Sequence, residues 1–167
     1  MATRYGLEKW FPEALARFGT YTVFDLLIKY IKEKRIKLDK TRFDGLVTYH
    51  NPCNYGRKAE KMFGHGFYEE PRWIIDHCIE HWVDMYPTGK NQFCCGGGGG
   101  ALTSGYNEER IYYGRRKAEQ IKTTGAQIVV VPCHSCHSQL HNIKSIYGME
   151  ELQVLYLWEV VAKCLVV

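Results

Sequence analysis

Five cysteines in three groups are the residues of this sequence most capable of chemistry: Cys53 alone, the adjacent Cys94 and Cys95, and the CxxC pair Cys133 and Cys136. They belong to a total of seven cysteines in 167 residues. A protein that is not exported keeps its thiols reduced, so disulfides do not explain this number. An odd number also cannot pair completely, and the grouping is not that of a small disulfide scaffold. We therefore expect most of these thiols to be metal ligands or redox groups.

The number of thiols discriminates between metals. A structural zinc ion takes four ligands and a simple cubane cluster takes four cysteines, so five thiols exceed both requirements. Neighbouring residues of a strand point to opposite faces, so Cys94 and Cys95 can bind one small ion only where the backbone turns sharply. A larger iron–sulfur cluster with a bridging thiolate would use all five. Gly96 and Gly97 would let the backbone approach that cluster and offer amide protons to its sulfurs. Zinc remains the alternative.

Two other motifs overlap these cysteines. The CHSC segment of Cys133 and Cys136 could by itself be a thioredoxin-like redox pair. Gly96, Gly98 and Ala101 fit the GxGxxA pattern of dinucleotide-binding turns. That run lacks a P-loop lysine, however, and the cysteine pair occupies the turn where a phosphate would bind. Both interpretations are weaker than a shared metal centre.

The two remaining cysteines and three histidines have less specific interpretations. Cys78 lies in a helical run and Cys164 near the apolar C-terminus, so we expect both to be small packing residues. His50, His134 and His137 lie close in sequence to the cysteine groups, where a proton donor to a leaving thiolate would be useful. For each of these histidines, a surface or supporting position is the stronger interpretation.

The elements that must position the cysteines alternate between strands and helices. Short β-prone runs occupy residues 46–49, 127–131 and 153–156, and a further run at 91–93 precedes the cysteine pair. Helical periodicity predicts helices at 8–18, 22–37, 71–86 and 107–124. The alternation predicts an α/β fold, a small parallel sheet flanked by helices. All five thiols would then gather at the carboxyl edge of the strands, where open α/β sheets bind ligands and helix N-termini lower thiol pKa values.

The boundaries of the domain and of its clearest helix can also be predicted. The helix 107–124 would have Asn107 as its cap, acidic residues in its first turn, and Gly125 as its end. A cluster of charged residues at 34–44 suggests a division into a helical N-terminal extension, residues 1–43, and a cysteine-rich α/β domain, residues 44–167.

Composition excludes several classes of function. The net charge of +4 is spread along the chain, which argues against nucleic-acid binding. No apolar run approaches the roughly 18 residues of a membrane span. Residues 1–10 lack the continuous apolar segment of a secretory signal, so we expect a cytoplasmic protein.

Three strings carry a resemblance to a known family: YHNPCNYGR, FCCGGGGGALTSGY and VVPCHSC. They resemble the cysteine-rich CCG domain of the B and D subunits of heterodisulfide reductases over about residues 20–163. These motifs are most similar to those of the heterodisulfide-reductase-like (K) subunit of the membrane complex that accompanies dissimilatory sulfite reductase. The resemblance implies a noncubane 4Fe-4S cluster bound by five cysteines, here Cys53, Cys94, Cys95, Cys133 and Cys136.

The resemblance also implies a reaction and partners. The cluster would reduce or form a disulfide or trisulfide-type bond of a thiol substrate or a small sulfur-carrier protein. The cluster would exchange electrons with other iron–sulfur subunits or with membrane quinone-interacting subunits, at the inner face of the membrane. The sequence lacks the ferredoxin-type CxxCxxCxxxC motif of close relatives, so we expect it to act only within a larger protein or complex. The alternatives are a structural zinc or electron-transfer CCG domain, or the iron–sulfur subunit of a flavin-linked hydroxy-acid or succinate oxidase.

Overall fold

The computed structural model describes residues 2–166 and divides them into two compact units, which meet in sequence between Ile36 and Lys37. The first unit contains the helices α1 (Ala2–Trp10), α2 (Pro12–Phe18) and α3 (Val23–Lys32). The single helix predicted at 8–18 is thus interrupted, because Pro12 begins a new helix. A capping box between Thr22 and Asp25 begins α3. That helix ends before the predicted residue 37, since the chain turns at Lys34 with a φ of +55°.

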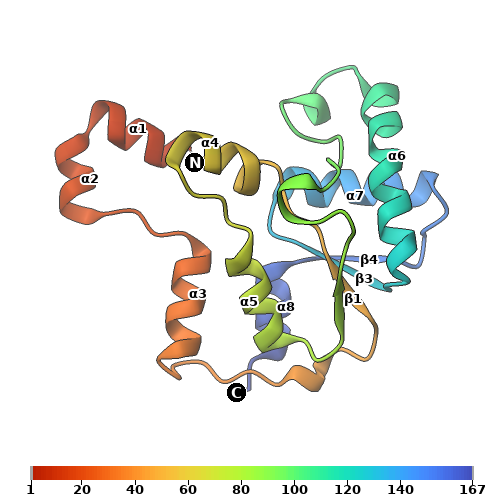
Figure 1. Ribbon diagram of the computed structural model, residues 1–167, viewed down its shortest axis with the longest axis horizontal. Coiled ribbons are helices and arrows are strands. Elements are labelled where there is room, and N and C mark those ends of the chain that lie inside the picture. Colours follow the sequence, from red (N-terminus) through yellow and green to blue (C-terminus); the bar gives the residue numbers. More distant parts are fainter. Residues whose placement is uncertain (1, 167) are drawn as a thin grey trace. The chain divides into compact units, whose positions relative to one another are not determined.

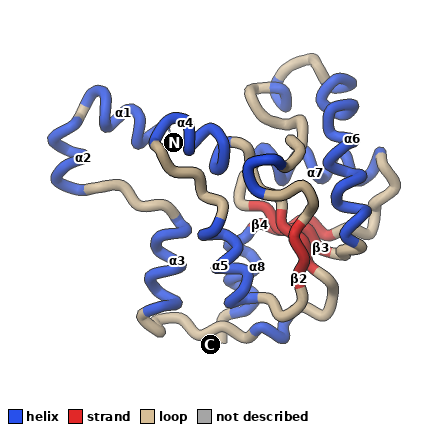
Figure 2. Tube along the Cα trace, viewed as in Figure 1, coloured by secondary structure: helices blue, strands red, loops and turns tan. Residues whose placement is uncertain are grey.

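The second unit is built on a four-stranded parallel sheet in the order β2-β1-β3-β4 (Figure 2). Its strands are β1 (Val47–Tyr49), β2 (Trp82–Asp84), β3 (Ile128–Val131) and β4 (Gln153–Tyr156). Every neighbouring pair is parallel. The predicted α/β class and the strands predicted at 46–49, 127–131 and 153–156 are confirmed.

Helices cover both faces of this sheet. They are α4 (Ala59–Phe63), α5 (Glu69–Cys78), α6 (Asn107–Thr124), α7 (His134–Ile146) and α8 (Leu157–Cys164). Helix α6 packs on α7, while α5 packs on α8, and Figure 1 shows the two pairs on opposite sides of the strands. Shorter turns are a π-helical η2 (Asn54–Lys58) and the 3₁₀ turns η1 (Lys40–Arg42), η3 (Gly89–Asn91) and η4 (Ala101–Thr103). None of the described helices has the length and apolar character to cross a membrane.

The strand order creates a switch point between β1 and β3. The chain leaves β1 towards β2 on one side of the sheet and leaves β3 towards β4 on the other. Right-handed crossovers place the connecting helices on opposite faces in these two directions. A crevice therefore opens between the carboxyl ends of β1 and β3, which is where open α/β sheets bind ligands. Both strands are buried along their whole length, as expected for strands covered on both faces.

Two predicted elements around β2 are wrong. The helix predicted at 71–86 ends at Cys78, and Trp82–Asp84 instead forms the edge strand β2. Its backbone pairs with β1, which satisfies hydrogen-bonding groups that a helix would satisfy locally. The strand predicted at 91–93 does not form, because η3 occupies Gly89–Asn91. The pair Cys94 and Cys95 therefore lies on a loop rather than at the end of a strand.

Helix α6 has the predicted bounds and ends at Gly125, whose φ is +69°. Its predicted cap is wrong, because Tyr106 occupies the cap position and the Asn107 side chain accepts hydrogen bonds from Arg110. The packing role expected for Cys78 and Cys164 agrees with their positions. Both are fully buried where α5 meets α8, and the Cys164 thiol donates to the Cys78 carbonyl at 3.2 Å.

Replacing Ile143 on α7 tests the core between this helix and α6. Ile143 is fully buried, whereas Ile146 on the same helix is 59% exposed. We expect Ile143→Ala to lower the free energy of unfolding in urea by about 2–5 kcal/mol through the cavity it leaves. The control Ile146→Ala should stay within about 0.5 kcal/mol of the parent. Equal effects of the two changes would contradict the packing described here.

Candidate metal centre

The three cysteine groups reach the switch point from three different segments. Cys53 lies four residues beyond the end of β1, and Cys133 is the N-cap residue of α7, directly beyond β3. Cys136 lies in the first turn of α7. The loop after β2 brings in Cys94 and Cys95. The carboxyl edge expected from the sequence thus holds all three groups, although the loop, not a strand, delivers the cysteine pair.

The five thiols form one continuous run. The sulfur atoms of Cys95 and Cys136 are 3.4 Å apart. Side-chain hydrogen bonds join Cys53 to Cys94, Cys94 to Cys95, and Cys133 to Cys136. Cys94 is exposed and Cys53 is half-buried, whereas the other three are buried. The structure therefore brings together every cysteine that the sequence proposes as a ligand, and it leaves one side of the run open to solvent.

Two glycines of the predicted site are held too tightly for any side chain. Gly96 has a φ of +90°, and a Cβ placed on it would collide with the carbonyl oxygen of Arg110 in α6. A Cβ on Gly97 would lie 2.6 Å from Cβ of Gln139 and 2.9 Å from the carbonyl oxygen of Ser135, both in α7. Glycine is needed at both positions because the loop backbone lies against two helices at once.

Helix α6 carries a matching glycine that the sequence analysis missed. A Cβ on Gly114 would lie 3.0 Å from the Cys95 carbonyl oxygen and 2.8 Å from Cγ2 of Ile143. The signal was a glycine inside an otherwise strong helix, which often marks a close approach of another backbone. Gly96 also donates its amide proton to the Cys94 sulfur at 3.4 Å. Backbone contacts thus fix both cysteines of the pair, through the Cys95 carbonyl and through the Cys94 sulfur.

The N-terminus of α7 stabilises a thiolate at Cys133. The thiol of Cys136 donates to the Cys133 sulfur, and so do the backbone amides of Cys136 and Ser135. Together these donors lower the pKa of Cys133 to about 6. Thiolates are the form of cysteine that binds metals. The pKa of Cys136 shifts the other way, because its hydrogen bonds with Cys133 and Cys95 and its burial raise it.

Cys94 is the second thiolate of the run. It accepts hydrogen bonds from the thiols of Cys53 and Cys95 and from the Gly96 amide, which hold its pKa well below the usual range. The donor Cys53 shows the reverse, because its hydrogen bond to Cys94 raises its pKa. Without a metal, the two thiolates, Cys94 and Cys133, are therefore stabilised by the protons of neighbouring thiols. A cation bound among them would remove the need for the shared protons.

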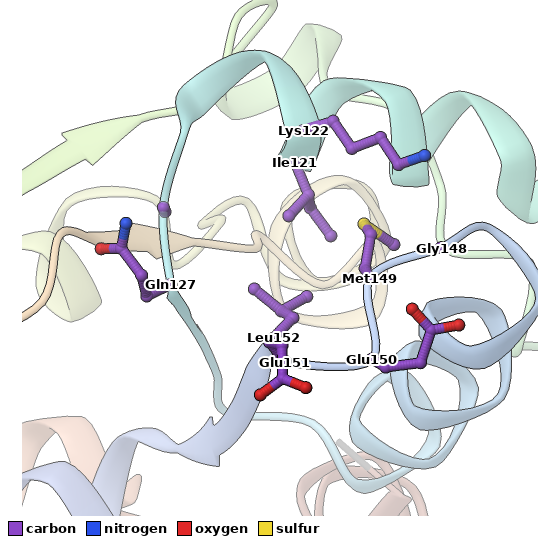
Figure 3. Close-up of a pocket in the computed structure, with 9 residues that line it drawn as sticks. Ile121, Lys122, Gln127, Gly148, Met149, Glu150, Glu151 and Leu152 are labelled. Carbon is purple, nitrogen blue, oxygen red and sulfur yellow. The ribbon is translucent and has the colours of Figure 1, made fainter.

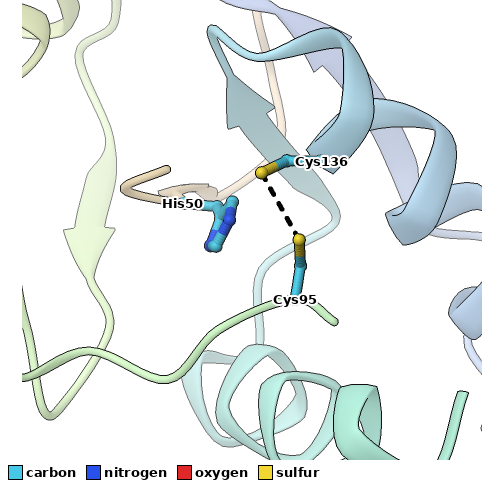
Figure 4. Close-up of side chains that lie close together, drawn as sticks. All are labelled: His50, Cys95 and Cys136. Carbon is cyan, nitrogen blue, oxygen red and sulfur yellow. Dashed lines mark hydrogen bonds between the residues drawn. The ribbon is translucent and has the colours of Figure 1, made fainter. Parts of the chain in front are cut away.

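Of the three histidines near the cysteine groups, His50 faces the thiols (Figure 4). It is 1% exposed, and both of its ring nitrogens lack a hydrogen-bond partner. Its ligand atom and the sulfurs of Cys95 and Cys136 all lie within 4.8 Å of one another. Burial lowers the pKa of His50 well below its usual value, so the imidazole is neutral and available to a metal or a hydrogen-bond acceptor.

The other two histidines have aromatic partners. Nδ1 of His134 lies 2.5 Å from the Tyr156 hydroxyl, and the His137 ring stacks on Tyr156 at 3.9 Å between centroids. A pocket of about 260 Å³ lies away from the cysteines, at the amino ends of β3 and β4, where Ile121 and Met149 face it (Figure 3). The pocket contains none of the candidate ligands.

Comparison with known proteins matches this region to one family. The family model described as "CCG: Cysteine-rich domain" matches residues 47–141, which include β1, β2, β3 and all five clustered thiols. The segment that the family model matches therefore contains both the switch point of the sheet and the five thiols gathered there.

Several longer proteins are similar to the chain. It is 28% identical to the Hdr-like menaquinol oxidoreductase iron-sulfur subunit 2 of Archaeoglobus fulgidus, over 72% of this chain and 22% of that protein. It is 28% identical to the D subunit of the dihydromethanophenazine:CoB–CoM heterodisulfide reductase of Methanosarcina acetivorans, over 83% and 33%. The B subunit of the fumarate reductase (CoM/CoB) of Methanothermobacter marburgensis is also 28% identical, over 92% and 29%. The chain therefore spans a third or less of the length of these relatives.

An alanine at Gly97 tests whether backbone packing forms the site. We expect Gly97→Ala to lower the free energy of unfolding by about 1–3 kcal/mol through overpacking against α7, and to weaken metal binding. The matched control is Gly105→Ala, because no heavy atom lies within 4 Å of a Cβ at that position. Urea unfolding and metal content measure the two effects. Wild-type behaviour of Gly97→Ala in both would refute the close contact.

Proposed function

The chain belongs to the cysteine-rich CCG family, and on that premise we propose that it is the iron–sulfur module of a heterodisulfide-reductase-like oxidoreductase. The observation that carries this proposal is the continuous run of five thiols at the switch point of the sheet. One zinc ion or one cubane would leave a thiol of that run without a metal. A cluster that takes all five, such as the noncubane 4Fe-4S type, matches the donor set.

The surroundings of the thiols fit such a group. His50 is buried with two unpartnered ring nitrogens, a situation that costs about 1–3 kcal/mol for each polar group left unsatisfied. A cluster sulfur beside Cys95 and Cys136 would accept a hydrogen bond from the N–H group of this ring. Gly96 and Gly97 let the loop backbone pack against α6 and α7, which holds Cys94 and Cys95 beside the group. We propose Cys53, Cys94, Cys95, Cys133 and Cys136 as its ligands.

The proposed reaction is the reduction or formation of a sulfur–sulfur bond. A bound cluster supplies one-electron chemistry to a thiol or disulfide, which the side chains of this protein cannot supply themselves. The chain's residues control access, because Cys94 faces solvent while Cys95 is 1% exposed. A small thiol or disulfide, or a sulfur-carrier protein, would therefore approach from the side of Cys94 and the glycine run.

Partner subunits are proposed from the relatives. The chain corresponds to a third or less of each of them, so electron delivery falls to other segments or subunits. The functions named for two relatives, menaquinol and dihydromethanophenazine oxidoreduction, support iron–sulfur or membrane quinone-interacting partners at the inner face of the membrane. The fumarate reductase relative supports the alternative of an iron–sulfur subunit in a flavin-linked hydroxy-acid or succinate oxidase.

A structural zinc site is the second candidate. The ligand atoms of His50, Cys95 and Cys136 are close enough to bind one small ion. Zinc readily takes such a mixed nitrogen and sulfur donor set in a tetrahedral arrangement. A third thiol of the run would complete the four ligands. The two remaining thiols have no role in this arrangement, which favours the cluster.

Iron content distinguishes the two candidates. After anaerobic reconstitution with iron and sulfide, we expect about four irons per chain. Cys94→Ala or Cys95→Ala should remove the cluster because each deletes a ligand. Cys78→Ala and Cys164→Ala are the matched controls, since both cysteines are buried away from the site, and they should retain iron. Stoichiometric zinc without iron in the reconstituted parent protein would overturn the cluster.

Electron paramagnetic resonance tests the chemistry on sulfur. When a thiol or persulfide is added to the oxidised protein, we expect the spectrum of the centre to change because substrate sulfur meets the cluster. The S-methylated form of the same compound is the control, since it has no thiolate. A spectrum indifferent to every thiol and persulfide would restrict the protein to electron transfer.

A further inference from the structure

Lys117 in α6 is a fully buried lysine, with an exposed fraction of 0%. Lysines are almost never buried completely unless they are paired with an opposite charge. Within residues 2–166, Lys117 takes part in none of the ion pairs with carboxylates. Its ammonium group donates to the neutral Gln120 side chain and lies 3.5 Å from the Met85 sulfur. The described protein groups therefore do not neutralise this charge.

Lys117 lies on the side of α6 that packs against the cysteine-pair loop. It lies three residues after Gly114, on the face of α6 that contacts the Cys95 carbonyl. Met85, which its ammonium group touches, belongs to the same buried cluster as Cys95 and Cys136. Burial lowers the pKa of Lys117 to about 7, and negative charge on the nearby sulfurs of Cys95, Cys136 and Cys94 opposes this shift. The site contains the opposite charge that Lys117 otherwise lacks.

We propose that Lys117 is the buried counter-charge of the metal centre and stabilises its more negative, reduced state. This inference rests on the proposed function, because it takes a thiolate-bound cluster as the group that carries the negative charge. Electrostatic interactions between buried groups are stronger than at the surface and are screened little by salt. A single lysine on the protein side of the thiols can therefore shift the redox potential without touching the substrate. Lys117 is in this sense a positioning residue, not a catalytic one.

A structural role predicts something different. If Lys117 only filled space, an unbranched apolar side chain of similar length would replace it at no cost to the centre. Removal of a buried charge that lacks an ion-pair partner could even stabilise the cluster-free protein. Lys117→Met distinguishes a space-filling role from a counter-charge, because it keeps the shape of the side chain and removes its charge. Lys117→Arg keeps the positive charge and should therefore preserve the properties of the centre.

The test compares midpoint potentials of the reconstituted full chain by redox titration, followed by electron paramagnetic resonance. We expect Lys117→Met to lower the midpoint potential, because the reduced centre loses a stabilising charge, and high salt should not abolish the shift. Lys117→Arg should remain near the wild-type potential. The matched control is Lys122→Met, which removes the same charge from an exposed position on the same helix. It should have a small effect that salt removes.

Three outcomes would overturn the proposal. The first is an unchanged potential in Lys117→Met with full iron content. The second is equal loss of the cluster in Lys117→Met and Lys117→Arg, because retained charge would then make no difference. The third is equal zinc affinity of the parent and Lys117→Met, measured if the parent chain takes up zinc and no iron. Zinc uptake without iron contradicts the proposed function separately, and weaker zinc binding by Lys117→Met alone would still support a counter-charge.

Discussion

The contact between the cysteine-pair loop and two helices is the constraint on which the rest of the site depends. Gly96 and Gly97 on the loop and Gly114 on α6 allow backbone to meet backbone without intervening side chains. That contact holds the Cys95 sulfur 3.4 Å from the Cys136 sulfur on α7. If a side chain separated the loop from the helices, the thiols would no longer form one run. Because glycine has no side chain, the loop can pack closely on the helices, and this packing sets the distance between the sulfurs.

The sheet supplies the second constraint, because its strand order decides which segments end together. β1 and β3 are neighbours in the sheet although 78 residues separate the end of one from the start of the other. Their carboxyl ends bring Cys53 and Cys133 to the same crevice. The result is an asymmetric site with an exposed thiol, Cys94, on the outside and two buried nitrogen-bearing side chains, His50 and Lys117, on the inside. Such asymmetry suits a centre that meets substrate on one side and is tuned from the other.

Much of this arrangement could be predicted from residue patterns, and the failures have physical causes. The strands at 46–49 and 127–131 were predictable because both are continuous β-prone runs, and α6 was predictable from its length and terminal glycine. The residue pattern predicts a helix at Trp82–Asp84, because three residues are too few to show a strand period and pairing with β1 decides their conformation. The residue type of Asn107 suits a cap, but its side chain accepts a hydrogen bond from Arg110 instead.

The chemical content of the protein can be predicted from its residues: five thiols in three groups, glycines after the central pair, and alternating elements that form a parallel sheet. These features depend on residue type and short-range spacing, which a sequence states directly. The folded molecule is needed to show that His50 faces the thiols, that Cys94 meets solvent, and that Lys117 is buried. Those properties arise from packing between segments far apart in the chain. Burial and long-range electrostatics exist only after the helices have packed on the sheet.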